Sequence, residues 1–228
     1  MPTKFNKYQI ATAVAVFFHF IGLAGILFLD RDFFVGLTSF NLLLSFALLT
    51  WTQQKINIFF VLFVLLVITV GFGAEVIGVN SKLLFGDYSY GNVLGIKWLQ
   101  VPLLIGINWF IIIYCCGVSI HTLLMKAINR VAADSNQPPQ ALRAISVIVD
   151  GATMAVAFDW LMEPVAVKLG FWSWNGDIPL YNYICWFVVS LLMLTFFQLL
   201  NFEKQNKFAV NLLLVQAMFF LILRSFLQ

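Results

Sequence analysis

The sequence has few charged residues. Of its 228 residues only 10% are Asp, Glu, Lys or Arg, against about 25% in a typical soluble domain. The 13 Lys and Arg and 10 Asp and Glu are too few to cover a globule of this size, and 62% of the residues are hydrophobic. The formal net charge of +3 is too small and too dispersed for a nucleic-acid binder. This composition excludes soluble and disordered classes and indicates an integral membrane protein.

Residues for metal, redox and cofactor chemistry are also scarce. Cys115, Cys116 and Cys185 lie in apolar runs without a CxxC spacing, so we expect small buried side chains rather than disulfides or metal ligands. We find no metal-ligand cluster, glycine-rich phosphate loop, dinucleotide fingerprint, nucleophile–His–acid set or Asp-rich magnesium motif. A retinal protein needs a lysine deep in its last helix, whereas Lys207 lies at the edge of the last run. We therefore expect no cofactor and no metal.

Long apolar runs are what the sequence does contain. A spanning helix takes about 20 apolar residues, and seven runs of that kind are bounded by charge, Pro, Asn or Gly. They cover residues 8–29, 33–51, 56–79, 101–124, 141–163, 181–201 and 208–227. They predict an all-α, polytopic protein of about seven transmembrane helices in a single integral membrane domain, residues 1–228. The first run is too long for a signal-peptide core. The second is the weakest, and an interfacial helix is the alternative there.

The distribution of Lys and Arg predicts the orientation. With seven spans, eight basic residues fall on the N-terminal side and five on the other, namely Arg31, Lys82, Lys97, Lys168 and Arg224. This excess favours a cytoplasmic N-terminus. The location that we expect is the cell (inner) membrane of a prokaryote. The segments 80–100 and 164–180 then lie on the outer face.

A short pattern occurs twice. Pro-Leu-x-x-x-Ile-x-Trp-Phe occupies residues 102–110 at the start of the fourth run and residues 179–187 at the start of the sixth. An acid, Glu75 or Glu163, lies near the end of the preceding run in each case. We interpret this as an internal parallel repeat of helices three–four and five–six, about an axis along the membrane normal. Chance similarity between two apolar helix starts is the alternative.

Ionisable groups inside a membrane are costly and are functional candidates. Glu75, Asp159 and Glu163 fall in the outer half of the bilayer, and Asp159 and Glu163, four residues apart, share a helix face. Asn108, Asn182 and Tyr183 reach a similar depth from the fourth and sixth helices. The alternative is that the acids face lipid headgroups.

Two other polar residues lie apart from this group. Asp150 is roughly 180° round the helix from Asp159 and about 13 Å deeper, so we expect a structural role with an interhelical hydrogen bond. His19 falls near the middle of the first helix without a second ligand nearby. We expect it to be a packed residue rather than a metal ligand.

Acids in an apolar, aromatic pocket suit proton-initiated chemistry. The chain has 25 Phe, 7 Trp and 6 Tyr, which fit an interfacial belt or the walls of a pocket for a long apolar ligand equally well. Burial favours the neutral form of a carboxyl group, so one acid can hold a proton while its neighbour is ionised. A protonated acid can transfer that proton to an alkene, and aromatic faces and a carboxylate stabilise the cation. Hydration, cyclisation and isomerisation all begin in this way.

The residues of both halves resemble the membrane-integral carotenoid biosynthesis protein family. The first half carries Glu75-x-x-Gly78, Phe85-Gly86-x-Tyr88-x-Tyr90-Gly91, Val101-Pro102-Leu103 and Trp109. The second half carries Asp159-x-x-x-Glu163-Pro164, Trp172-x-Trp174, Pro179-Leu180-x-Asn182-Tyr183 and Trp186. The resemblance covers roughly residues 70–190. It implies a cofactor-independent carotenoid 1,2-hydratase of the gamma-carotene or bisanhydrobacterioruberin hydratase type, which converts a terminal C=C of an acyclic end group to a tertiary alcohol.

We assign roles to the candidate residues on this basis. Glu75 is the candidate general acid, and Asp159 and Glu163 would position and deprotonate the water. Substrate or water would be positioned by Asn108, Asn182, Tyr183, Tyr88, Trp109 and Trp186. The expected partners are a long apolar carotenoid and the lipid bilayer, with no nucleic acid. Self-association and association with other carotenoid enzymes both stay open.

Departures from the family pattern leave alternatives. Glu163 stands where the family usually has Asp, which bears on substrate preference more than on reaction class. The repeat also resembles heterodimeric lycopene cyclases, but their Pro-x-Glu-Glu motif reads Pro-Leu-Tyr-Asn at residues 179–182. An end-group cyclase is therefore the second hypothesis, and a non-catalytic carotenoid-binding membrane protein is the third.

Overall fold

The computed structural model describes residues 6–131 and 138–227. Within these ranges seven helical spans are long and apolar enough to cross a membrane, which confirms the predicted all-α, polytopic architecture. The second span consists of two consecutive helices, α2 and α3. The helices are α1 (Lys7–Phe28), α2 (Arg31–Gly36), α3 (Thr38–Thr52), α4 (Ile58–Ser81), α5 (Leu104–Val131), α6 (Gln140–Lys168), α7 (Leu180–Leu199) and α8 (Lys207–Phe226).

Short polar side chains begin several of these helices. The Asn57 side chain accepts a hydrogen bond from Phe60 N at the start of α4 (2.9 Å). Asp30 caps α2 in the same way through Phe33 N (3.0 Å). Such caps satisfy amide groups that have no partner within the helix. They explain how polar residues between the apolar runs fix where α2 and α4 start.

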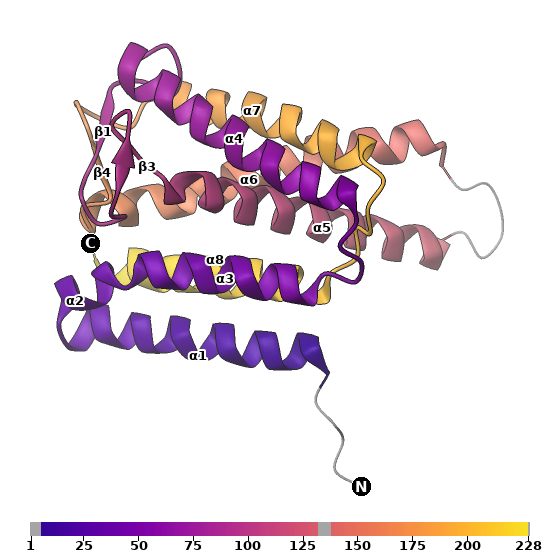
Figure 1. The fold of residues 1–228 in the computed structure, drawn as a ribbon, viewed down its shortest axis with the longest axis horizontal. Coiled ribbons are helices and arrows are strands. Elements are labelled where there is room, and N and C mark those ends of the chain that lie inside the picture. The colour runs from indigo at the N-terminus through magenta and orange to yellow at the C-terminus, as the bar shows by residue number, and fades with distance from the viewer. Residues whose placement is uncertain (1–5, 132–137, 228) are drawn as a thin grey trace, which may run out of the picture.

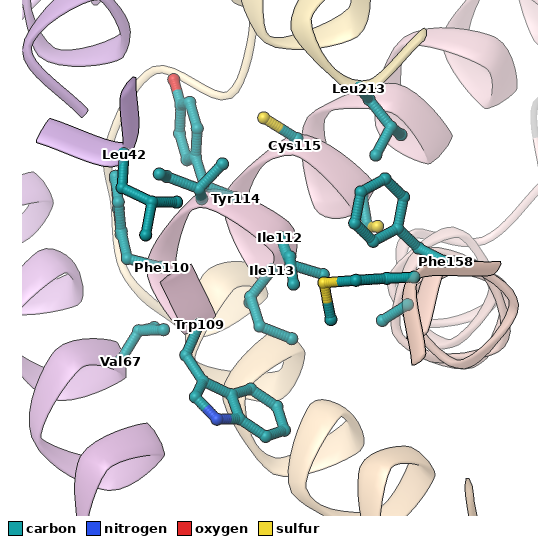
Figure 2. Close-up of a cluster of buried hydrophobic side chains, with 14 of the residues drawn as sticks. Leu42, Val67, Trp109, Phe110, Ile112, Ile113, Tyr114, Cys115, Phe158 and Leu213 are labelled. Atoms are coloured by element: carbon teal, nitrogen blue, oxygen red, sulfur yellow. The ribbon is translucent and has the colours of Figure 1, made fainter. Parts of the chain in front are cut away.

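Helix α5 forms the centre of the bundle. It contacts α3, α4, α6, α7 and α8, and all its residues from 109 to 116 are buried. A helix that is apolar all round belongs inside a bundle. Figure 2 shows its side chains directed toward Leu42 of α3, Val67 of α4, Phe158 of α6 and Leu213 of α8. The three cysteines are buried and free, as the sequence predicts.

The short strands of the described residues lie at one end of the bundle, opposite the beginning of α1 (Figure 1). β1 (Tyr88–Tyr90) pairs antiparallel with β4 (Trp172–Trp174), with Ser89 opposite Ser173. β2 (Lys97–Trp98) pairs with β3 (Val101–Pro102). The sequence predicts the segments 80–100 and 164–180 to be loops on the same face of the membrane. The pairing of β1 with β4 agrees with a shared face.

The fifth span is longer than predicted. The predicted span ends at Glu163, whereas α6 continues through Pro164 to Lys168, so the predicted boundary is wrong. Proline has no amide hydrogen and leaves the carbonyl four residues earlier without its helical donor. That carbonyl belongs to Trp160, and Arg224 of α8 replaces the missing donor through a hydrogen bond from its Nη1 (3.0 Å). A side chain from a neighbouring helix thus lets the helix pass the proline.

The structure also places the two polar residues outside the acidic group. Asp150 is exposed and accepts a hydrogen bond from Ser146 of its own helix (2.6 Å), so the predicted interhelical bond is wrong. His19 is buried, with Nδ1 2.8 Å from the Ala15 carbonyl and its ring edge-on to Phe219. The residues that the structure describes contain no cluster able to hold a metal ion.

Candidate functional site

Three acids from two helices line one cavity near the strands. Glu75 comes from α4, and Asp159 and Glu163 come from α6, with exposed fractions of 5%, 0% and 2%. The cavity has a volume of about 30 Å³, which is enough for water but far too small for an isoprenoid end group. Its remaining wall is largely aromatic and includes Phe85, Tyr88, Tyr90, Trp109, Trp172, Trp174 and Trp186.

Glu75 accepts hydrogen bonds from three aromatic side chains. Tyr88 and Tyr90 of β1 donate to Oε2 at 2.5 and 2.8 Å, and Trp109 of α5 donates from Nε1 to Oε1 at 2.9 Å. Burial and the neighbouring charge of Glu75 raise the pKa of both tyrosines above their usual range. The phenols therefore stay protonated, and all three groups stabilise negative charge on Glu75.

Glu163 is held by the other strand of the pair. Trp172 donates from Nε1 to Oε1 at 2.6 Å, and Trp174 donates to the same oxygen. An indole can only donate, so Oε1 is the unprotonated oxygen of this carboxyl group. A proton on Glu163 must therefore reside on Oε2.

Asp159 differs from the two glutamates in having an oxygen without a partner. Asn182 of α7 donates from Nδ2 to Oδ2 at 3.0 Å, whereas Oδ1 is fully buried and makes no hydrogen bond. A buried carboxyl oxygen without a donor is costly. A water molecule in the adjoining cavity can supply that donor.

The donors around the acids are all neutral: phenols, indoles and an amide. They stabilise a carboxylate without cancelling its charge. Three carboxylates in one apolar cavity repel one another, so such a group keeps at least one proton. The arrangement can therefore present an acid and a base to the same small volume.

Equivalent positions of the proposed repeat lie against one another. Trp109 stacks on Trp186 with ring centroids 3.8 Å apart, and the Ser89 and Ser173 hydroxyls are 3.2 Å apart. These contacts are those expected of a two-fold relation between the halves. The helix starts differ by one residue, because α7 begins directly after Pro179 and α5 begins two residues after Pro102. The repeat itself stays a prediction.

The two halves of the proposed repeat have different residues at the position of Asp159. Counting back four residues from Glu75 gives Gly71, where the second half has Asp159. A Cβ atom at Gly71 would lie 2.6 Å from Trp109, so this position has no room for any side chain. The first half likewise has Ile105 where the second half has Asn182. Asp159 and its hydrogen-bond partner Asn182 therefore have no counterparts in the first half.

The structure brings together eight of the nine predicted site residues. Tyr183 is the exception, since it is half-buried and does not line the cavity. Three hydrogen-bond donors to the acids have no role in the sequence analysis: Tyr90, Trp172 and Trp174. The Tyr-x-Tyr and Trp-x-Trp spacings could have identified these three donors, because alternate residues of a strand point to the same face.

Comparison with known proteins gives one match. A family model described as carotenoid biosynthesis protein matches residues 33–228, which contain all the residues of the acidic cavity. No curated protein and no solved structure matches the chain.

Proposed function

Because the chain belongs to the carotenoid biosynthesis protein family, we propose that it hydrates a terminal C=C of an acyclic carotenoid end group to a tertiary alcohol. The observation that carries this proposal is Asp159, which lines a water-sized cavity together with two further acids and whose buried Oδ1 has no hydrogen-bond partner. Hydration needs both a proton donor and a bound water, and this cavity offers a place for each.

Glu75 is the proton donor in this proposal. Its proton goes to the less substituted alkene carbon, and the alkene π electrons form the new C–H bond, leaving a tertiary cation. Protonating an alkene is difficult because a carboxylic acid is a weak acid for this purpose. In this proposal the proton that the cavity retains lies on Oε2 of Glu75, because the Trp109 indole donates to Oε1. After the transfer the three donors stabilise the carboxylate that remains.

The cation forms among aromatic rings. Trp109 and Trp186 form a stacked pair in the cavity wall, and Trp172 and Trp174 lie beside Glu163. Aromatic faces attract a cation, by about 2 kcal/mol or more when the site is desolvated. A second carboxyl group at Glu163 adds electrostatic stabilisation.

Asp159 completes the reaction in this proposal. A water bound to Oδ1 attacks the tertiary carbon, and its surplus proton passes to Asp159 as the C–O bond forms. Asn182 fixes the orientation of the carboxyl group through Oδ2. Return of the proton to Glu75 through cavity water restores the starting state. The sum is alkene plus water to alcohol, without oxidant or reductant.

Pigment analysis tests this proposal against both alternatives. The chain is expressed in a host that accumulates lycopene, and extracted pigments are analysed by chromatography and mass spectrometry. We expect a product heavier by one water for each end that reacts, and none from Asp159→Asn at equal protein level. A product of unchanged mass with altered absorption would instead indicate cyclisation. Unchanged pigment in the presence of membrane-inserted protein would contradict an enzymatic role.

A further inference from the structure

Two larger chambers neighbour the acidic cavity, each sharing wall residues with the next. An inner chamber of about 90 Å³ shares part of its wall with the acidic cavity, including Asn108 and Met162. An outer chamber of about 340 Å³ shares Asn41 and Phe219 with the inner one. The inner chamber therefore lies between the acidic cavity and an outer chamber that is lined largely by α1 and α3.

The outer chamber reaches the side of the bundle. Its wall includes Ile21 of α1, Leu37 at the junction of α2 and α3, and Phe40 of α3, which are 37%, 42% and 51% exposed. These residues belong to segments that span the membrane. Large apolar side chains exposed at such a position face lipid rather than water. The outer chamber is therefore open to the bilayer between α1 and α3.

We infer that the carotenoid enters sideways from the bilayer between α1 and α3 and that its end group crosses both chambers to reach the acids. This inference rests on the proposed function. A C40 polyene dissolves in the hydrocarbon layer and has no route through water, which makes a lateral opening its natural entrance. The polyene behind the reacting end then lies along the outer chamber.

Side chains at the inner boundary have to move for the end group to arrive. The acidic cavity is large enough for water only, and Met162 is one of the residues that line both this cavity and the inner chamber. Methionine is unbranched and adapts its shape readily. Displacement of Met162 joins the two volumes and brings the alkene beside the acids.

One edge of the inner chamber is polar and suits the product. Asn41 donates from Nδ2 to His19 Nε2 (3.4 Å), because His19 uses its Nδ1 hydrogen for the Ala15 carbonyl. Oδ1 of Asn41 is left buried without a partner. A tertiary alcohol leaving along this route carries a hydroxyl that can donate to this oxygen. His19 itself precedes residue 33, where the match to the family model begins.

A blocking variant with a designed rescue tests the route. A Cβ atom at Gly22 would lie 3.8 Å from the ring of Phe219 and meet nothing else, so Gly22→Phe fits the backbone but fills the outer chamber. Phe219→Ala removes the ring that borders this space. Gly73→Phe is the matched control, because Gly73 lies in spanning helix α4 with no neighbour within 4 Å of its Cβ.

The expected result is a rise in KM without a matching loss of kcat. Gly22→Phe should raise KM for lycopene about ten-fold, with kcat within about three-fold of wild type. Gly22→Phe/Phe219→Ala should recover most of this loss, and Gly73→Phe should behave as wild type. In parallel, carotenoid-loaded vesicles are mixed with each protein, and the rate of tryptophan quenching reports entry without chemistry.

Two results would overturn the route: Gly22→Phe matching Gly73→Phe in KM and quenching rate, or a loss that Phe219→Ala fails to rescue. Failure of the proposed hydration looks different. No variant would then add water, while slower quenching in Gly22→Phe alone, restored in the double variant, would still support lateral entry.

Discussion

Replacing Glu75 by Gln removes an acidic proton while keeping the shape of the side chain. The surroundings of Glu75 allow the amide to fit. Trp109 can only donate, so the amide oxygen must take the place of Oε1. The amide nitrogen then faces Tyr88 and Tyr90, whose hydroxyls can rotate and accept. Because hydrogen bonds are retained, we expect the free energy of unfolding to change by only about 1 kcal/mol.

The effect on the reaction should be far larger. A positioned general acid contributes about 10²–10⁴-fold to a rate, which corresponds to about 3–5 kcal/mol of transition-state stabilisation. Gln at residue 75 cannot transfer a proton, and it has no carboxylate for the three donors to stabilise. We therefore expect kcat to fall at least about 100-fold, with carotenoid binding largely retained.

Lipid-reconstituted protein and lycopene provide the assay. Hydrated product is quantified by mass spectrometry, and binding is followed by quenching of tryptophan fluorescence. Asp150→Asn is the control, since it makes the same kind of change at an exposed position of α6 and should keep the wild-type rate. Hydration by Glu75→Gln at the wild-type rate would place the acid elsewhere and refute this mechanism.

Three further predictions concern separate parts of the molecule. Asp159→Asn should reduce kcat at least about 100-fold, because an amide cannot take the proton of the attacking water; an unchanged rate in the same assay would exclude Asp159 as the base. Arg224→Met should destabilise the protein by about 1–3 kcal/mol, because the carbonyl freed by Pro164 loses its donor; thermal unfolding in detergent measures this, and an unchanged midpoint would contradict it. Cysteines introduced at Lys82 and Arg130 should react with impermeant reagents from opposite sides of the membrane, and labelling from the same side would refute the topology.

The sequence is sufficient to predict the spanning helices because the bilayer imposes their length and apolar character. The ends of these helices are harder to predict from the sequence. Proline at position 164 normally favours the end of a helix, and the residue that compensates for it, Arg224, lies 60 residues later. The chain offers no local signal for that contact.

The acids could likewise be found from the cost of burying charge, but not all their partners could. Asn182 and Tyr183 have nearly the same depth, yet neighbouring residues on a helix point about 100° apart, so only Asn182 faces the cavity. Trp172 and Trp174 act through a strand three residues long, which pairs with a strand 84 residues earlier in the chain. Such a pairing depends on the packing of the helices and not on strand propensity.

The pairing of β1 with β4 has a consequence for biogenesis. Each glutamate receives indole or phenol donors from the strand that follows its own helix, and the two strands complete each other's backbone hydrogen bonds. During synthesis, α4 and α5 enter the membrane, with β1 between them, before α6 and β4 emerge from the ribosome. Until then β1 has an open edge, and the ring of Trp109 has not met Trp186. The acidic cavity therefore assembles only when the later half arrives, and a chain truncated before β4 would retain Glu75 with its donors but lack a closed cavity.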